Sequence, residues 1–217
     1  MKKIALVLSG CGHLDGAEIT ESVSLLIALN QAGAQVSQFA PDMDFCERNH
    51  ITRELVQGSL RNTLVEAARI SRGQVKSLTE LRVLDFDGVA FAGGMGVARN
   101  LCDWAEIRSQ GLVHVEVRRI LTEFHEASKP IGAVCIAPVL VGLVLGQHKV
   151  EITLGGENDV AKEIRKTGAI SVPCPVTDFV TDRANKIVTS PAYMHEALPH
   201  EIFQGISGLA RELVEMA

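Results

Sequence analysis

The sequence of 217 residues is poor in aromatic side chains, which make up only 4% of it. It also lacks a surplus of positive charge, because the formal net charge is −5 at pH 7 and the pI is about 5.8. Proteins that grip nucleic acid without sequence preference combine a basic surface with stacking aromatic residues. Neither feature is present here, so we expect no nucleic-acid partner.

Long apolar runs are missing as well. The longest uncharged stretch, 131–146, contains a proline and is shorter than the ~20 residues that span a bilayer. The first apolar run, 4–8, is shorter than the ~7–15 residues of a secretory signal. We therefore expect no membrane association, a soluble protein and, as the default, a cytoplasmic location, with an organelle left open.

The five cysteines are odd in number, widely spaced and without a CxxC pair. This pattern argues against both a disulfide framework and a structural metal site, and it is typical of a reducing compartment. The five positions are Cys11, Cys46, Cys102, Cys135 and Cys174.

Short, continuous apolar runs alternate with stretches of helical periodicity, which predicts a mostly parallel sheet covered on both faces. We expect strands at 3–9, 35–40, 88–92, 131–134 and 150–154. We expect helices at 19–32, 61–71, 113–124, from 138, at 160–166 and from 195. The segment 45–58 has no clear period; it is interpreted as irregular, either covering the site or belonging to an interface. No linker or repeat divides the chain.

In sheets of this kind, chemistry takes place at the carboxyl ends of the strands. The loops to examine are therefore 9–18, 92–99, 135–138, 154–158 and 190–195.

Cys135 lies in the stretch PIGAVCIAP, between an apolar run and a proline that suits the first turn of a helix. If the strand ends at Val134 and the helix starts near Ala137, Cys135 occupies the sharp turn between them. The N–H groups at a helix start favour an anion, so a thiol in this position is expected to ionise near neutral pH and act as a nucleophile. The alternative is that Cys135 simply packs in the core.

Two other loops carry candidate groups. The glycines of AGGMG, residues 92–96, can expose the backbone N–H groups that an oxyanion hole requires, or they can form an ordinary turn. Glu18 stands at the expected start of the first helix. Its carboxylate either caps that helix or faces the thiol and exchanges a proton with it. The residues leave both alternatives open.

The first loop also invites a nucleotide-binding interpretation. Its GCGHLDG, residues 10–16, is one residue longer than the dinucleotide fingerprint G-x-G-x-x-G, and Asp42 follows the second strand at a suitable distance for a ribose. However, Asp15 and Glu18 place two carboxylates where a pyrophosphate would have to lie. We therefore expect no nucleotide and no other cofactor.

Four motifs together resemble the ElbB-like proteins, which are labelled isoprenoid biosynthesis proteins with an amidotransferase-like domain. The motifs are MKKIALVLSGCG…DGAEI, FAGGMGVARNL, GAVCIAP and VTSPAYM. ElbB-like proteins belong to the ThiJ/PfpI group of the class I glutamine amidotransferase-like superfamily. The resemblance covers essentially the whole chain and implies one domain over 1–217. Its fold would be an α/β, flavodoxin-like three-layer sandwich with a mostly parallel sheet and a nucleophile-elbow cysteine.

The resemblance also implies roles for individual residues. Cys135 matches the nucleophile, and Glu18 matches the glutamate of the first helix that contacts it. The backbone amides of Gly93, Gly94 and Ile136 match the oxyanion hole.

The histidines depart from the superfamily pattern. Many members place a histidine directly after the cysteine, where this chain has Ile136, or on a later loop. His195, after the last strand, and His13, in the loop beside Glu18, are the candidates for an assisting base. Without such a base the glutaminase reaction is hard to run, because ammonia must be protonated and water activated.

A simpler chemistry suits these residues, and members of the ElbB-like family have been described as glyoxalases. A thiolate at Cys135 can add to an aldehyde, and Glu18 can then move a proton between adjacent carbons. We therefore expect a glutathione-independent glyoxalase that converts small 2-oxoaldehydes such as glyoxal and methylglyoxal to 2-hydroxy acids, without metal or cofactor. The alternatives are a redox-sensing or regulatory protein that uses the same thiol, and an amidotransferase-like fold without glutaminase activity. The resemblance implies a homodimer.

Overall fold

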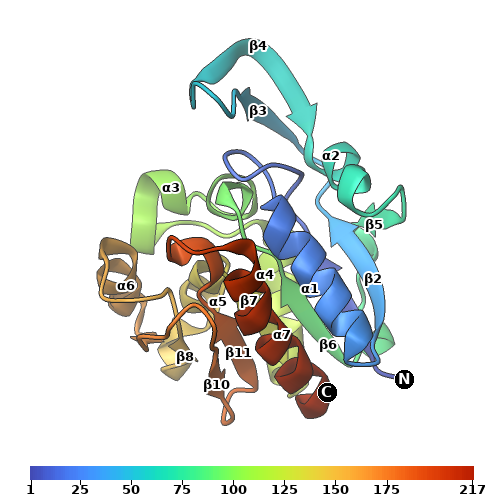
Figure 1. Ribbon diagram of the computed structural model, residues 1–217, viewed down its shortest axis with the longest axis vertical. Helices are drawn as coiled ribbons and strands as arrows, with labels where there is room; N and C mark the ends of the chain where they lie inside the picture. Colours follow the sequence, from blue (N-terminus) through green and yellow to red (C-terminus); the bar gives the residue numbers. More distant parts are fainter.

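The computed structural model describes all 217 residues and is built around a seven-stranded sheet with the order β10-β11-β7-β6-β1-β2-β5 (Figure 1). The strands are β1 (Lys3–Val7), β2 (Gln35–Ala40), β5 (Val75–Ser77), β6 (Gly88–Phe91), β7 (Ile131–Val134), β10 (Val180–Asp182) and β11 (Ile187–Ser190). All neighbouring pairs are parallel except β10 with β11. The mostly parallel sheet is confirmed.

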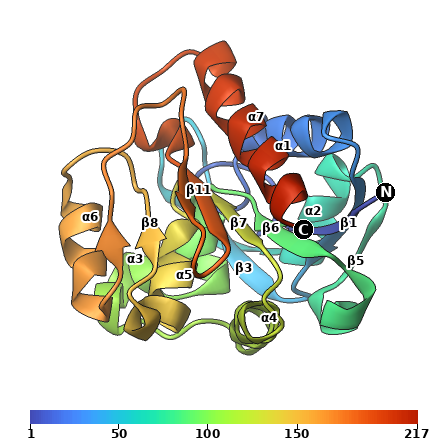
Figure 2. The same cartoon turned by 90° about the horizontal axis from the view of Figure 1, so that it is seen from below.

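Helices cover both faces of this sheet, as expected for buried parallel strands. On one face α1 (Ile19–Gln31) packs beside α7 (Pro199–Met216), and α4 (Val115–Glu126) and α5 (Pro138–Leu145) lie on the other (Figure 2). Three shorter helices, α2 (Thr63–Ile70), α3 (Trp104–Ile107) and α6 (Asp159–Ile164), lie around the periphery. No helix has both the length and the apolar character to cross a membrane.

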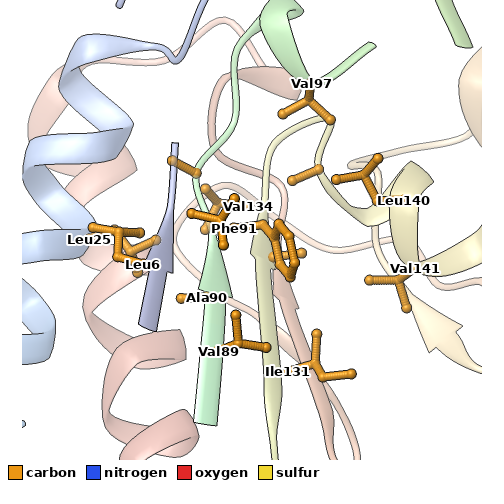
Figure 3. Close-up of a cluster of buried hydrophobic side chains, with 14 of the residues drawn as sticks. Leu6, Leu25, Val89, Ala90, Phe91, Val97, Ile131, Val134, Leu140 and Val141 are labelled. Carbon is orange, nitrogen blue, oxygen red and sulfur yellow. The ribbon is translucent and has the colours of Figure 1, made fainter. Parts of the chain in front are cut away.

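The core runs through the central strands. Every residue of β6, β7 and β11 is buried, as is all of β1 except its first residue. Side chains from both sides of the sheet pack there, among them Leu6 and Leu25 on the α1 side and Phe91 with Leu140 on the α5 side (Figure 3). This rigid centre fixes the loops at the strand ends.

The strand order reverses direction at β1. The chain passes from β1 outward to β2 and β5 and then returns to β6 on the other side of β1. Such a switch point opens a crevice at the carboxyl ends of the two adjacent strands, where ligands bind in open α/β sheets. The loops after β1 and β6 meet there, beside the end of β7.

The irregular conformation expected for residues 45–58 was wrong. They belong to a two-stranded antiparallel hairpin, β3 (Asp44–Arg48) with β4 (Leu55–Asn62), which stands away from the sheet at the top of Figure 1. Most of β4 is exposed, so no buried face imposes an alternating pattern on its sequence. Because β4 runs to Asn62, the expected helix at 61–71 begins two residues late.

Besides β3 and β4, three short strands of the structure were not predicted. β5, β9 (Ile170–Ser171) and β10 contain two or three residues each, too few for a period to be visible. The strand expected at 150–154 is reduced to β8 (Glu151–Ile152), which pairs only with β9.

Candidate active site

Cys135 occupies the turn between β7 and α5. Its φ of 60° lies in the left-handed region that side-chain-bearing residues rarely adopt, and its N–H donates to the carbonyl oxygen of Ser190 at 2.9 Å. Pro138 opens α5 at a position where a missing N–H costs nothing. The elbow geometry at Cys135 is therefore present as expected, with strained backbone held by the neighbouring strand β11.

The backbone N–H groups of Gly94 and Ile136 point toward the Cys135 sulfur and stabilise negative charge on it. Both were expected as oxyanion donors. Gly94 has a φ of 98°, and a methyl group there would clash with the main chain of the first loop, at Gly16 and Glu18. This position therefore requires glycine for both reasons.

The carboxyl group that faces the thiol belongs to Glu21 and not to Glu18. Glu21 lies in the first turn of α1, is 0% exposed, and interacts with the Cys135 thiol. Its Oε1 accepts a hydrogen bond from the N–H of Tyr193 at 3.1 Å. Its Oε2 has no N–H or O–H donor and lies against Gly93, where any side chain would clash with it and with Cβ of Cys135.

Burial dominates the protonation of this pair. It raises the pKa of Glu21 to about 8, although the neighbouring Cys135 thiol and the hydrogen bond from Tyr193 act in the opposite direction. Burial, and then the neighbouring Glu21 carboxylate, raise the pKa of the Cys135 thiol well above its usual value. The amides of Gly94 and Ile136 oppose this shift without cancelling it. The expected thiolate near neutral pH was wrong: thiol and carboxyl are both protonated in the resting site.

Glu18 is the N-cap of α1. Its Oε2 accepts a hydrogen bond from the N–H of Glu21 at 2.6 Å, and its own N–H donates to the carbonyl oxygen of Gly93 at 3.0 Å. Its carboxylate also lines the cavity above the thiol. The capping alternative is therefore the observed one, and the cap sets the position of the helix turn that carries Glu21.

A cavity of about 500 Å³ opens over Cys135. Four of the five expected loops contribute to it, and the fifth is replaced by Val160 at the start of α6. The wall is mostly apolar. Its residues are His13, Glu18, Gly94, Met95, Cys135, Ile136, Val160, Tyr193 and Met194.

The two candidate histidines have different positions. His13 lines the cavity, and burial followed by the neighbouring His50 lowers the pKa of its imidazole, so it is neutral near pH 7. His195 is not among the residues of the cavity wall; its Nε2 lies 2.9 Å from the carbonyl oxygen of Cys174. No group of three or more histidine, cysteine, aspartate or glutamate side chains is placed to hold a metal ion.

One signal in the sequence points to Glu21. Within α1, Glu21, Leu25 and Ala28 follow one another at spacings of four and three, and all three are buried. A carboxylate on the apolar stripe of an amphipathic helix is costly unless it is paired or neutral, which marks it as a functional candidate.

The site combines an elbow cysteine beside the switch point, converging backbone amides and a buried glutamate from the first helix. These features define a class I glutamine amidotransferase-like fold of the DJ-1/ThiJ/PfpI type. Comparison with known proteins supports this class. The chain is 40% identical to a human mitochondrial protein named glutamine amidotransferase-like class 1 domain-containing protein 3, covering 99% of this chain and 83% of that one. It is 39% identical to the rat mitochondrial ES1 protein homolog, covering 99% and 84%. The chain therefore belongs to the ES1/ElbB-like family.

Solved structures agree. An isoprenoid biosynthesis protein with an amidotransferase-like domain from Ehrlichia chaffeensis superposes with a TM-score of 0.92 at 35% identity, covering 100% of this chain and 99% of that one. Drosophila melanogaster DJ-1beta shares the fold alone, with a TM-score of 0.56 at 16% identity over 99% and 94% of the two chains. No protein-family model matches the sequence.

Proposed function

We propose that this protein is a cysteine-dependent, cofactor-free glyoxalase-like enzyme that converts small 2-oxoaldehydes, such as glyoxal and methylglyoxal, to 2-hydroxy acids. The observation that carries the proposal is the pairing of the Cys135 thiol with the buried Glu21 carboxyl at the floor of an open cavity. A nucleophile next to a group that exchanges protons near neutral pH is the minimum that this reaction needs.

The first step is addition of the thiol to the aldehyde. The step starts from the fraction of molecules in which Glu21, with a pKa of about 8, has lost its proton: the sulfur of Cys135 bonds to C1 while the thiol proton passes to the Glu21 carboxylate. The C1 oxygen takes up the electron pair of the carbonyl bond, and the N–H groups of Gly94 and Ile136 lie close enough to the sulfur to stabilise that charge. Return of the proton from Glu21 to this oxygen gives a hemithioacetal and regenerates the carboxylate.

The second step is an internal oxidation and reduction. Glu21 removes the C1 hydrogen as a proton, and the electron pair forms an enediolate with C2. Protonation at C2, with transfer of the O1 proton to O2, leaves a thioester at C1 and a hydroxyl at C2. C1 is oxidised and C2 is reduced, so no external oxidant or reductant is required. Glu21 takes the role that the sequence suggested for Glu18, because it is the carboxyl that interacts with the sulfur.

The last step is hydrolysis of the thioester. Water adds to C1, and the sulfur of Cys135 leaves and recovers its proton. His13 lines the same cavity with a lowered pKa, so its neutral imidazole can accept a proton from that water. The sum is aldehyde plus water giving the 2-hydroxy acid.

The two alternatives have less support at this site. A redox sensor depends on an exposed thiolate, whereas Cys135 is 7% exposed and its pKa is raised. A glutaminase must also protonate the leaving ammonia, and His13, the histidine on the cavity wall, has a lowered pKa and carries no imidazolium proton to donate near pH 7.

Turnover of methylglyoxal in the absence of added thiol tests the proposal. We expect the protein to produce lactate and Cys135→Ser to abolish this. The matched control is Cys46→Ser, because Cys46 is exposed on β3 and is not among the residues of the cavity wall. Equal turnover by Cys135→Ser and the parent protein would overturn the proposal. The names of the curated relatives assign those proteins to mitochondria; for this chain the cytoplasm, like the homodimer, stays a prediction.

A further inference from the structure

The hairpin β3–β4 reaches the cavity through one side chain. His50, in the hairpin turn, lies against the loop that follows β1, and its ring meets that of His13 edge to face, with the centroids 5.1 Å apart and the planes at 74°. His13 is on the cavity wall. A residue of the exposed hairpin therefore touches a residue of the candidate site.

The first loop is shaped to receive this imidazole. Gly12 has a φ of 124°, and a methyl group there would lie 2.6 Å from Nε2 of His50. A side chain at position 12 would thus occupy the place of the ring. Both the conformation and the space require glycine, so the loop and the hairpin turn fit each other closely.

Hydrogen bonds fix the orientation of His50. Its Nδ1 lies 3.1 Å from the carbonyl oxygen of Arg48, and its Nε2 accepts from the N–H of Leu14 at 3.4 Å. These contacts match the neutral tautomer with the proton on Nδ1. Protonation would convert Nε2 from an acceptor to a donor. Two donors, Nε2–H and the N–H of Leu14, would then face each other, and the hydrogen bond between them would be lost. Its nearest carboxylate oxygen is Oδ1 of Asp15, at 3.6 Å.

Asp15 makes a second link between the two segments. Its Oδ2 accepts a hydrogen bond from the N–H of Arg48 at 2.7 Å, and its side chain is largely buried. The loop is therefore joined to the hairpin at two points, one through the carboxylate of Asp15 and one through the imidazole of His50.

We propose that His50 is a positioning residue for His13: the hairpin imidazole holds the first loop so that His13 faces the cavity. His50 makes no contact with the cavity itself and acts only through its neighbour. The activity consequence rests on the proposed function, whereas the coupling between the two rings does not.

Four charged or titratable groups face His13 from the surrounding elements. His50 and Arg53, from the hairpin turn, oppose the protonation of His13. Asp15, from its own loop, and Glu18, at the start of α1, favour it. Burial is the largest influence and also lowers the pKa of His13. Removing His50 relieves both the burial and the repulsion, so the two effects on the His13 pKa have the same sign.

The test is an NMR titration of the histidine Cε1 protons in the intact protein. In His50→Gln we expect the titration midpoint of His13 to rise by about half a pH unit, the size of the effect of a like charge at this separation when water screens it. A second variant, Gly12→Ala, places a methyl group 2.6 Å from the position of Nε2 of His50 and so displaces the ring; it should move the midpoint of His13 in the same direction.

The matched control is His148→Gln. His148 belongs to a second histidine pair, with its ring 4.7 Å from that of His125, and neither residue lines the cavity. This change should leave His13 unaffected. A His13 midpoint that does not move in His50→Gln would overturn the proposal. If His50→Gln does not fold, the same measurement on Gly12→Ala decides alone.

The acid limb of methylglyoxal turnover provides a second measurement. In His50→Gln the acid limb should shift to higher pH by the same amount as the NMR midpoint. At high pH, kcat should fall less in His50→Gln than in His13→Gln, which removes the base itself. If the parent protein does not turn over methylglyoxal, the proposed function fails, and the NMR titration still decides whether the two rings are coupled.

Discussion

The N–H of Tyr193 donates a hydrogen bond to Oε1 of Glu21 at 3.1 Å, joining two residues that are 172 positions apart in the sequence. Tyr193 also lines the cavity and belongs to a short 3₁₀ turn, Ala192–Met194, that follows β11. The bond satisfies one oxygen of the buried carboxyl and leaves the other facing Gly93 and Cys135. The last loop of the sheet thus fixes which oxygen meets the thiol.

Gly93→Ala should disable the site. Its methyl group would clash with Oε2 of Glu21 and Cβ of Cys135, so the pair must separate. We expect kcat/KM for methylglyoxal to fall about 10²-fold or more, and the free energy of unfolding to fall by about 1–3 kcal/mol.

The matched control for this substitution is Gly156→Ala, in the loop after β8. A methyl group at Gly156 meets nothing within 4 Å. It should change the free energy of unfolding by less than about 0.5 kcal/mol. Full activity in Gly93→Ala would show that the close approach of Glu21 and Cys135 is irrelevant to turnover.

Glu21→Gln should change how stability depends on pH. The pKa of Glu21 is raised from 4.5 to about 8 in the folded protein, so between these values the folded state holds a proton that the unfolded state has lost. Stability from this group is therefore fully present below about pH 4.5 and is lost as the pH rises toward 8. The loss has an upper limit of about 1.4 kcal/mol per pH unit.

Glutamine carries no ionisable proton, so Glu21→Gln should gain stability relative to the parent protein as the pH rises from 5 to 8. Urea unfolding at a series of pH values measures this difference. A constant difference between the two proteins across the range would contradict the raised pKa of the buried carboxyl.

His195→Ala separates a structural role from a catalytic one. Nε2 of His195 lies 2.9 Å from the carbonyl oxygen of Cys174, outside the cavity wall. Its loss should cost about 1–2 kcal/mol of unfolding free energy, and kcat/KM should change less than about threefold. A general base would instead lose about 10²-fold or more. Thermal unfolding and steady-state kinetics on the same preparation give both numbers.

Strands and helices with a strong period were predictable from the sequence, because continuous apolar runs such as that of β7 have no place except between two helical layers. The elbow at Cys135 followed from Pro138 and the end of that run. The hairpin β3–β4 could not be predicted, since it buries little of its surface and its residues are therefore free of alternation.

The site was predicted at the level of loops and partly at the level of residues. Gly94 and Ile136 direct their amides at the sulfur, but the carboxyl that faces it comes from one helical turn beyond Glu18. Which glutamate faces the thiol depends on where the helix starts. Because Glu18 is the N-cap of α1, Glu21 is the one of the two glutamates that lies on the buried face of the helix. The protonated state of Cys135 was missed because its burial outweighs the helix start, and burial is a property of the whole fold.

The central claim is that the buried carboxyl group of Glu21 raises the pKa of the Cys135 thiol. The pH dependence of Cys135 alkylation by iodoacetamide, followed by peptide mass, tests it most directly. The parent protein should react with a midpoint above the ordinary thiol pKa. Glu21→Gln removes the charge that raises the pKa of the thiol, so its midpoint should fall by about one pH unit or more. The isosteric control Glu18→Gln should shift the midpoint by less than about 0.3 unit, because Glu18 is absent from the groups that shift the thiol. An unchanged or higher midpoint in Glu21→Gln, or a larger shift in Glu18→Gln, would contradict the account.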